Sequence, residues 1–342
     1  MINLPTLPPI NSAFLRAFIT DAVLVRCGRT RDLRPLILTY FVTFRCDMRC
    51  TYCDYTDHGY AHRFKELESE GAREVLRICR EGVPAVAFSG GEPLLRSDIV
   101  ELVRYARTLG YRPISMFTNS LMLEEKQEVL EDIDYLQISL DTIDEELQDR
   151  LSGCRGAGRR IVNNIMRYAP LQKAKRFRLN INCVLSPANL DSVPELLRFA
   201  EETGVRFTFS PQLEADGQAA TVLHDPDTRH RYQRAVAAIL SHKRSTDVVL
   251  DILPFIRHVG NFQSGSCYPM LTPRVYPDGT LRFPCSIVCR SAPSVPELGS
   301  WRQVAMVLRK TPATCASPCL LPCYLEMSLL AEHPFALLQE LT

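Results

Sequence analysis

The stretch CDMRCTYC at residues 46–53 holds three cysteines, Cys46, Cys50 and Cys53, within eight positions. It follows closely on LILTYFVT at 36–43, an apolar run rich in β-forming residues that predicts a buried strand. The cysteines are therefore expected on a loop at the carboxyl end of a strand, which in α/β barrels is the catalytic face. Three thiolates so close together can surround one metal centre. An iron–sulfur cube can take three cysteines and leave one iron open.

Short apolar runs recur along the chain after this first strand, at 85–88, 114–118, 135–140, 177–185 and 205–209. Helical patterns separate them, and those at 97–109 and 191–203 each present one apolar face and end at a glycine. This alternation predicts parallel strands joined by crossover helices. Six strands are too few for a full eight-stranded barrel, which typically takes about 250 residues. The expected fold class is therefore α/β, with a partial (β/α)6 barrel.

The composition is that of a globular protein with one unusual feature. The chain has 342 residues, 46% of them hydrophobic and 23% charged, so it can bury a large core. Its net charge of +1 gives no overall attraction to nucleic acid, and no run of about 18 apolar residues predicts a transmembrane segment. The Pro-rich N-terminus does not have the pattern of a secretory signal, so a cytoplasmic protein is expected. Thirteen cysteines in such a chain indicate metal ligands rather than disulfides.

The pattern changes near residue 211, where a polar, irregular segment begins and a helix is expected at 231–242. Pro277-Asp278-Gly279 predicts the turn of a hairpin, and six cysteines surround it. We therefore expect a small C-terminal domain built on this hairpin. The predicted divisions are an N-terminal helical extension at 1–34, the barrel at 35–215, a helical linker at 216–254, the hairpin domain at 255–330 and a tail at 331–342.

The N-terminal extension has apolar residues at helical spacing over 14–26. This pattern predicts a helix that packs on the barrel. Peripheral contact of the same helix with a membrane surface or a partner is the alternative.

A second motif, Ser89-Gly90-Gly91-Glu92-Pro93, directly follows the second strand. The two glycines allow a ligand to approach the backbone closely, and Glu92 offers an acceptor for an amino group. Its position after the next strand puts this motif beside the cysteine loop.

The cysteine loop, with Tyr52 before its last cysteine, and the GGEP motif together resemble the radical S-adenosylmethionine (SAM) superfamily over residues 36–210. The resemblance implies a [4Fe–4S] cluster on Cys46, Cys50 and Cys53, the catalytic centre, with SAM on its fourth iron. Reduction of SAM by the cluster would give a 5′-deoxyadenosyl radical that abstracts hydrogen from a substrate.

The ends of the next two strands also resemble this superfamily. Residues 118–120, Thr-Asn-Ser, are similar to its T-N-G motif, although Ser120 replaces the usual glycine, and 139–141, Ser-Leu-Asp, resemble its S-L-D motif. The residues that the resemblance implies for SAM binding are Tyr52, Gly90, Gly91, Glu92, Pro93, Asn119 and Ser139.

The late cysteines and the hairpin resemble the SPASM/twitch extension of radical SAM enzymes, which binds additional [4Fe–4S] clusters. The spacings depart from the full SPASM pattern, and six cysteines are too few for two fully ligated cubes. One auxiliary [4Fe–4S] cluster is therefore expected, with a zinc ribbon as the alternative. The expected ligands are Cys267, Cys285, Cys319 and Cys323, with Cys315 as a close fifth and Cys289 as a spare.

The resemblance predicts a radical SAM enzyme that draws electrons from a donor such as flavodoxin or ferredoxin. Because only a short segment precedes the first strand, a small-molecule or lipid-like substrate is favoured, and a SPASM-type peptide maturase is the alternative. The auxiliary cluster could transfer electrons or position the substrate. A zinc-binding scaffold without catalysis, in which His58 or His62 completes the first site, is the alternative from another class.

Overall fold

The structure, a computed structural model, describes residues 12–53, 60–285, 287, 293–310 and 319–335. One eight-stranded sheet forms its centre, in the order β6-β5-β4-β3-β2-β1-β7-β8. The strands are β1 (Ile37–Thr43), β2 (Ala85–Gly90), β3 (Ile114–Thr118), β4 (Tyr135–Ser139), β5 (Arg178–Leu185), β6 (Arg206–Pro211), β7 (Arg274–Val275) and β8 (Leu281–Arg282). β1 to β6 pair in parallel, each with the next in sequence. The predicted α/β class and the run of six parallel strands are thus confirmed.

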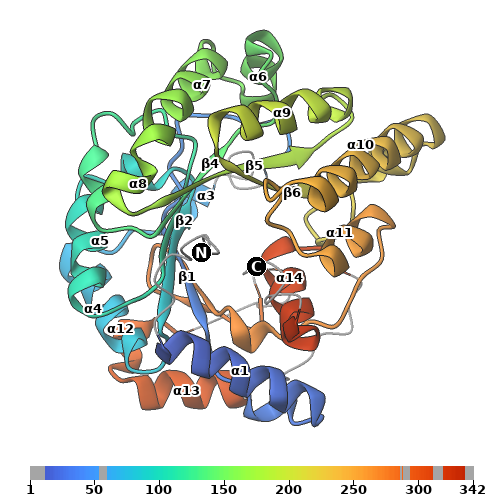
Figure 1. The fold of residues 1–342 in the computed structure, drawn as a ribbon. Coiled ribbons are helices and arrows are strands. Elements are labelled where there is room, and N and C mark those ends of the chain that lie inside the picture. The colour runs from blue at the N-terminus through green and yellow to red at the C-terminus, as the bar shows by residue number, and fades with distance from the viewer. Residues whose placement is uncertain (1–11, 54–59, 286, 288–292, 311–318, 336–342) are drawn as a thin grey trace, which may run out of the picture.

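Crossover helices cover the outer side of the curved sheet, with α4, α5, α7 and α9 forming an arc around the strands (Figure 1). The helices are α1 (Ser12–Arg26), α3 (Tyr60–Arg63), α4 (Ser69–Arg80), α5 (Ile99–Thr108), α6 (Glu145–Ser152), α7 (Ala157–Tyr168), α8 (Gln172–Lys175), α9 (Val193–Thr203), α10 (Pro226–Ser245), α11 (Leu253–Gly260), α12 (Val295–Leu298), α13 (Trp301–Lys310) and α14 (Pro322–Glu332).

The two faces of the sheet have different surroundings. On β1, Leu38, Tyr40 and Val42 alternate along the strand and are buried in the main core, on the side that the crossover helices cover. The apolar face predicted for the helix after β2 is also buried, as α5 shows. On the inner face, by contrast, Gln137 and Thr208 are partly exposed. The inner side of the sheet therefore remains accessible to water and to ligands.

The C-terminal hairpin continues the same sheet. β7 pairs in parallel with β1, with Arg274 opposite Thr39, and β8 pairs antiparallel with β7. Each strand of the hairpin predicted around the 277–279 turn has only two residues. The pairing holds the segment with the late cysteines directly against the first strand of the barrel.

Two other helices differ from their predicted bounds. α10 begins at Pro226 rather than at 231, because the Asp225 carboxylate accepts a 3.1 Å hydrogen bond from the Thr228 amide and caps the helix. α1 begins at Ser12 and buries Phe14 and Phe18, and it packs on α14. In the described part of the chain, no helix has the length and apolar character needed to cross a membrane.

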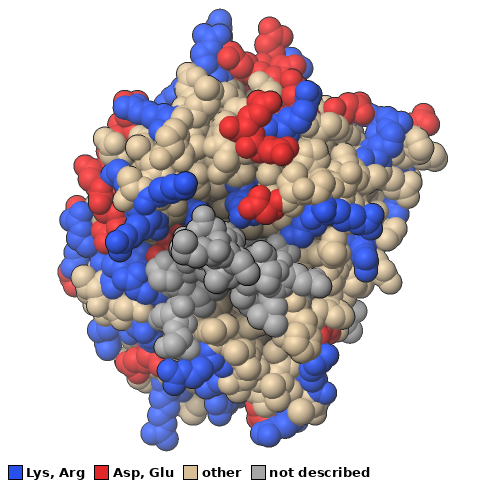
Figure 2. Space-filling model, viewed as in Figure 1, with Lys and Arg blue, Asp and Glu red and all other residues tan. Residues whose placement is uncertain are grey.

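Charged side chains of both signs are interspersed over the face of the molecule shown in Figure 2. This distribution agrees with the net charge of +1. No large patch of one sign is visible on the described surface in this view.

Candidate active site

The three cysteines of the 46–53 loop lie together at the carboxyl end of β1. Each is partly buried, and the thiols of Cys46, Cys50 and Cys53 act on one another electrostatically. Burial raises the pKa of Cys46 to about 12 and raises the pKa of Cys50 well above its usual value. Without a cation these buried thiols hold their protons. A bound metal centre would replace the protons, as metal ligation by cysteine requires.

The donor set suits an iron–sulfur cube. Among the described residues, no three His, Cys, Asp or Glu side chains converge closely enough to hold one metal ion. A cube binds each cysteine through a different iron, so its ligands need not converge on one point. Of the two histidines considered as zinc ligands, His62 is exposed on α3 and His58 lies outside the described residues.

The end of α6 holds the cysteine loop in place. The amides of Arg49 and Thr51 donate to the carbonyls of Ser152 and Leu151, at 2.8 and 2.9 Å. Gly153 follows in the left-handed region with φ of 61°, and a Cβ on it would lie only 2.6 Å from the Arg49 carbonyl oxygen. Only glycine allows the helix end to approach the loop this closely.

Tyr52 connects the cysteine loop to the next strands. Its hydroxyl donates a 2.5 Å hydrogen bond to Oδ2 of Asp141, which follows β4 and is 1% exposed. The Val184 amide of β5 donates to the other oxygen of Asp141 at 2.8 Å. Burial raises the pKa of Asp141 to about 6, and these two hydrogen bonds oppose the shift. The Tyr52 side chain, predicted to contact SAM, therefore uses its hydroxyl to bind Asp141.

The segment Gly90-Gly91-Glu92-Pro93, called the glycine strip below, lies directly against the start of the cysteine loop, as its place in the sequence predicts. The amides of Gly91 and Glu92 donate 2.8 Å hydrogen bonds to the carbonyls of Thr43 and Arg45. A Cβ on Gly91 would lie 2.3 Å from the Arg45 carbonyl oxygen, so no larger residue fits without a shift of the backbone. Pro93 is buried behind the strip, at the start of a short 3-10 turn.

Glu92 joins the ends of β2 and β3 from a position without exposed surface. Its carboxylate accepts hydrogen bonds from Thr118 Oγ1 and the Asn119 amide, both at 2.7 Å, and from the Leu94 amide at 2.9 Å. Burial raises the pKa of Glu92 to about 7, and the hydrogen bonds oppose this shift. The carboxylate, predicted as an acceptor for the SAM amino group, here faces protein donors. Glu92 nevertheless lies at the predicted site, because its backbone directly follows the two glycines.

Asn119 connects this group back to the cysteine loop, because its Nδ2 donates a 2.6 Å hydrogen bond to Oδ1 of Asp47. Asp47 and Asp141 are two residues of the site that the sequence analysis did not select. Asp47 lies inside the cysteine motif and Asp141 ends the Ser-Leu-Asp motif. Their positions within these motifs could have identified both residues as part of the site.

Ser139 is exposed at the end of β4 and pairs in register with Asn182 of β5. Thr208 of β6 extends this polar row and donates a 3.2 Å hydrogen bond to Asn182 Oδ1. These three side chains of the inner wall thus offer uncharged hydroxyl and amide groups. Such groups can bind polar ligands without requiring a particular charge.

Three of the late cysteines gather around Tyr324 at the start of α14. The buried hydroxyl of Tyr324 lies within electrostatic range of Cys267, Cys285 and Cys323. Arg274 Nη2 donates a hydrogen bond to Cys323 Sγ, and its guanidinium lies 4.5 Å from the centre of the Tyr324 ring.

The other two predicted auxiliary ligands have a different status. A Cβ on Gly217 would lie 2.8 Å from Cys319 Sγ, which places this sulfur beside the loop after β6. Cys315 and the spare Cys289 lie outside the described residues.

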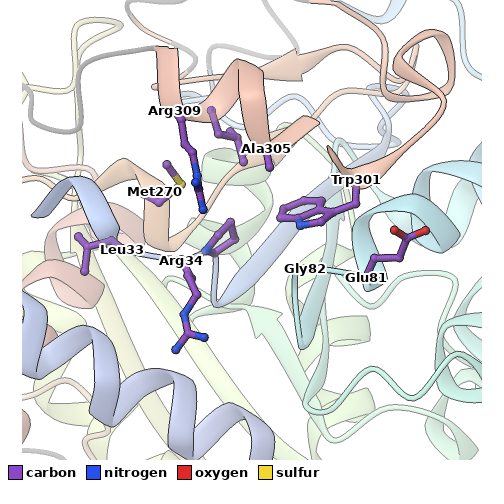
Figure 3. Close-up of a pocket in the computed structure, with 10 residues that line it drawn as sticks. Leu33, Arg34, Glu81, Gly82, Met270, Trp301, Ala305 and Arg309 are labelled. Atoms are coloured by element: carbon purple, nitrogen blue, oxygen red, sulfur yellow. The ribbon is translucent and has the colours of Figure 1, made fainter. Parts of the chain in front are cut away.

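A cavity of about 280 Å³ lies at the opposite end of the sheet. It is lined by Arg34 and Pro35, just before β1, by Gly82, shortly before β2, and by Trp301 and Arg309 of α13 (Figure 3). None of the predicted site residues lines it.

Comparison with known proteins shows which of them this fold and site resemble. Residues 40–200 match the model of the Radical SAM superfamily. The match covers somewhat less than half of the chain and indicates a radical SAM domain over these residues. The family implies SAM and one [4Fe–4S] cluster as cofactors.

Among curated proteins, the PqqA peptide cyclase of Gluconobacter oxydans (strain 621H) is 33% identical over 174 residues. The match covers 50% of this chain and 47% of that protein, so this chain matches about half the length of the relative.

Two groups of solved structures share the fold. Streptococcus suis SuiB bound to its precursor peptide SuiA has a TM-score of 0.60 and 18% identity, covering 83% of this chain and 68% of that one. Native anSMEcpe with bound AdoMet and the Cp18Cys peptide has a TM-score of 0.59 and 17% identity, covering 90% of this chain and 99% of that one.

Proposed function

We propose that this protein is a radical SAM peptide maturase, which modifies a residue of a peptide substrate. The observation that carries the proposal is the junction of three elements at one edge of the sheet: the cysteine loop, the glycine strip and the exposed Ser139. The similarity to PqqA peptide cyclase supports a peptide substrate. The expected small-molecule or lipid-like substrate finds no support among the matched relatives, and the peptide alternative fits them better.

Cys46, Cys50 and Cys53 would hold the [4Fe–4S] cluster, and the strip at 90–93 with Asn119 and Ser139 would hold SAM. When bound, the cluster and SAM would supply a 5′-deoxyadenosyl radical able to abstract hydrogen from an unactivated carbon. The chain itself fixes the geometry. Tyr52 and Asp141 hold the loop. The Glu92 side chain binds the end of β3, and its backbone amide donates to the Arg45 carbonyl at the start of the loop.

The inner wall would receive the peptide. Gln137, Asn182 and Thr208 line it on neighbouring strands and are each partly exposed. Amide and hydroxyl side chains can match both the donor and the acceptor of a peptide group. Substrate held there would lie beside the carboxyl edge, where the reacting carbon must come within about 3–3.5 Å of its partner.

The late cysteines would bind one auxiliary [4Fe–4S] cluster, with Cys267, Cys285 and Cys323 as ligands and Cys319 or Cys315 as the fourth. The gathering of the first three around Tyr324 supports this assignment. A one-electron donor such as flavodoxin or ferredoxin would supply the electrons.

The proposal is tested by measuring 5′-deoxyadenosine after anaerobic incubation of the reconstituted protein with SAM and dithionite. The assay is run alone, with the peptide fraction of a lysate of the source cells, and with the small-molecule fraction. We expect the peptide fraction to stimulate nucleoside formation, and Cys50→Ala to form none. Stimulation by the small-molecule fraction alone would overturn the peptide assignment and leave the radical chemistry intact.

A further inference from the structure

The two cysteine groups differ in the charged side chains that lie near their sulfur atoms. Cys46 has the carboxyl groups of Asp47 and Glu92 near it, and Cys50 has that of Asp141. Cys323, in contrast, accepts a hydrogen bond from the guanidinium of Arg274. A negative neighbourhood disfavours addition of an electron to a metal centre, and a positive one favours it.

Arg274 is held rigidly in its position. Its backbone lies in β7, opposite Thr39 of β1, and the residue is only 4% exposed. The guanidinium lies over the ring of Tyr324 at 4.5 Å and approaches that of Phe41 at 5.8 Å. Both rings favour a cation at their face and restrict where the side chain can lie.

The location of Cys323 adds a second positive influence. Cys323 lies in the first turn of α14, which begins at Pro322 and has eleven residues. The amino end of a helix carries a partial positive charge that stabilises an anionic sulfur. The guanidinium and the helix end therefore act on the same sulfur in the same direction.

We propose that Arg274 is a positioning residue that raises the reduction potential of the auxiliary cluster bound through Cys323. The inference rests on the proposed auxiliary cluster. A buried guanidinium that donates to a ligand sulfur withdraws electron density from it, as hydrogen bonds to cluster sulfurs do. Removal of the guanidinium should therefore make the auxiliary cluster harder to reduce.

The test uses a chain in which Cys46, Cys50 and Cys53 are alanine, so that only the auxiliary cluster is titrated. In this background we compare four proteins: the triple-alanine parent and its Arg274→Lys, Arg274→Gln and Arg282→Gln variants. Arg282 is the matched control, because it is the corresponding arginine of β8 and its guanidinium lies over Tyr276 at 4.5 Å. Iron and sulfide are counted, and the midpoint potential is measured by redox titration with electron paramagnetic resonance.

Each outcome has a defined meaning. We expect Arg274→Gln to shift the midpoint to more negative potential, Arg274→Lys to shift it less, and Arg282→Gln to leave it unchanged. If Arg274→Gln fails to load iron while Arg274→Lys loads fully, the requirement for a positive charge at this position is supported. An unshifted midpoint in loaded Arg274→Gln overturns the role of Arg274. Absence of iron from the triple-alanine parent overturns the auxiliary cluster itself, independently of the peptide assignment.

Discussion

The hydroxyl of Tyr52 and the carboxylate of Asp141 lie 2.5 Å apart, although 89 positions separate them in the chain. This hydrogen bond joins the loop of Cys50 and Cys53 to the end of β4. Because Asp141 also accepts from the Val184 amide, the loop is connected to two strands through one buried carboxylate. The geometry of the cysteine site thus depends on a residue far from the cysteine motif.

Removal of this hydrogen bond tests its importance. Tyr52→Phe leaves a buried carboxylate oxygen without its donor, which costs about 1–3 kcal/mol in such cases. We expect a lower free energy of unfolding by urea and a slower formation of 5′-deoxyadenosine at full iron content. Tyr105→Phe, on α5, is the control. Equal rates in Tyr52→Phe and the unmodified protein would show that the loop is held without this contact.

Cysteine substitution separates ligands from other thiols. Cys50→Ala should lose the iron of one cube and all nucleoside formation, because three cysteines are needed to hold the SAM-binding cluster. Cys27→Ser should change neither, since Cys27 is exposed at the end of α1. Iron and sulfide analysis of anaerobically prepared protein gives the answer. Retention of full iron in Cys50→Ala would contradict the ligand assignment.

The glycine strip makes a steric prediction. Gly91→Ala places a methyl group 2.3 Å from the Arg45 carbonyl oxygen, so the strip must move away from the loop. We expect a loss of about 1–3 kcal/mol in stability, as overpacking typically causes, together with much weaker SAM binding. The control is Gly71→Ala in α4, where the added carbon meets only the flexible Leu67 side chain at 3.2 Å. A SAM titration that gives the same Kd for Gly91→Ala and the control would disprove the role of the strip.

Ser139 makes a prediction about affinity. If its hydroxyl contacts SAM, Ser139→Ala should raise the Kd for SAM by about tenfold, which corresponds to about 1.4 kcal/mol. Stability should change little, because the side chain is exposed at the end of β4. Isothermal titration with the iron-loaded protein measures the Kd. An unchanged value would remove Ser139 from the SAM site.

The buried carboxyl of Asp21 should make the free energy of unfolding depend on pH, independently of the metal sites. Burial raises the pKa of this α1 carboxyl to about 6. The folded state therefore binds its proton more tightly than the unfolded state, and this stabilisation is lost as the pH rises through 6. Asp21→Asn should gain on the order of 1–2 kcal/mol relative to the unmodified protein between pH 5 and pH 8. Urea unfolding at both pH values measures the difference, and parallel curves for the two proteins would contradict it.

The sequence predicted those features that depend on local pattern. The six parallel strands followed from the periodicity of apolar residues, and the junction of the cysteine loop with the strip at 90–93 followed from parallel strand order. The pairing of β7 with β1 could not be predicted, because two-residue strands carry almost no pattern. The roles of Asp141 and Arg274 could not be predicted from the sequence either. Each depends on a contact between distant segments, which the residue type alone does not reveal.

Hydrogen transfer from substrate tests the central claim most directly. Source cells are grown on deuterated medium, and their lysate is separated into peptide and small-molecule fractions. Each fraction is incubated anaerobically with the reconstituted protein, unlabelled SAM and dithionite, and the mass of 5′-deoxyadenosine is measured. We predict one deuterium in the nucleoside from the peptide fraction, and its loss when that fraction is first digested with protease. Deuterium that comes only from the small-molecule fraction, and that survives protease treatment, would contradict a peptide maturase.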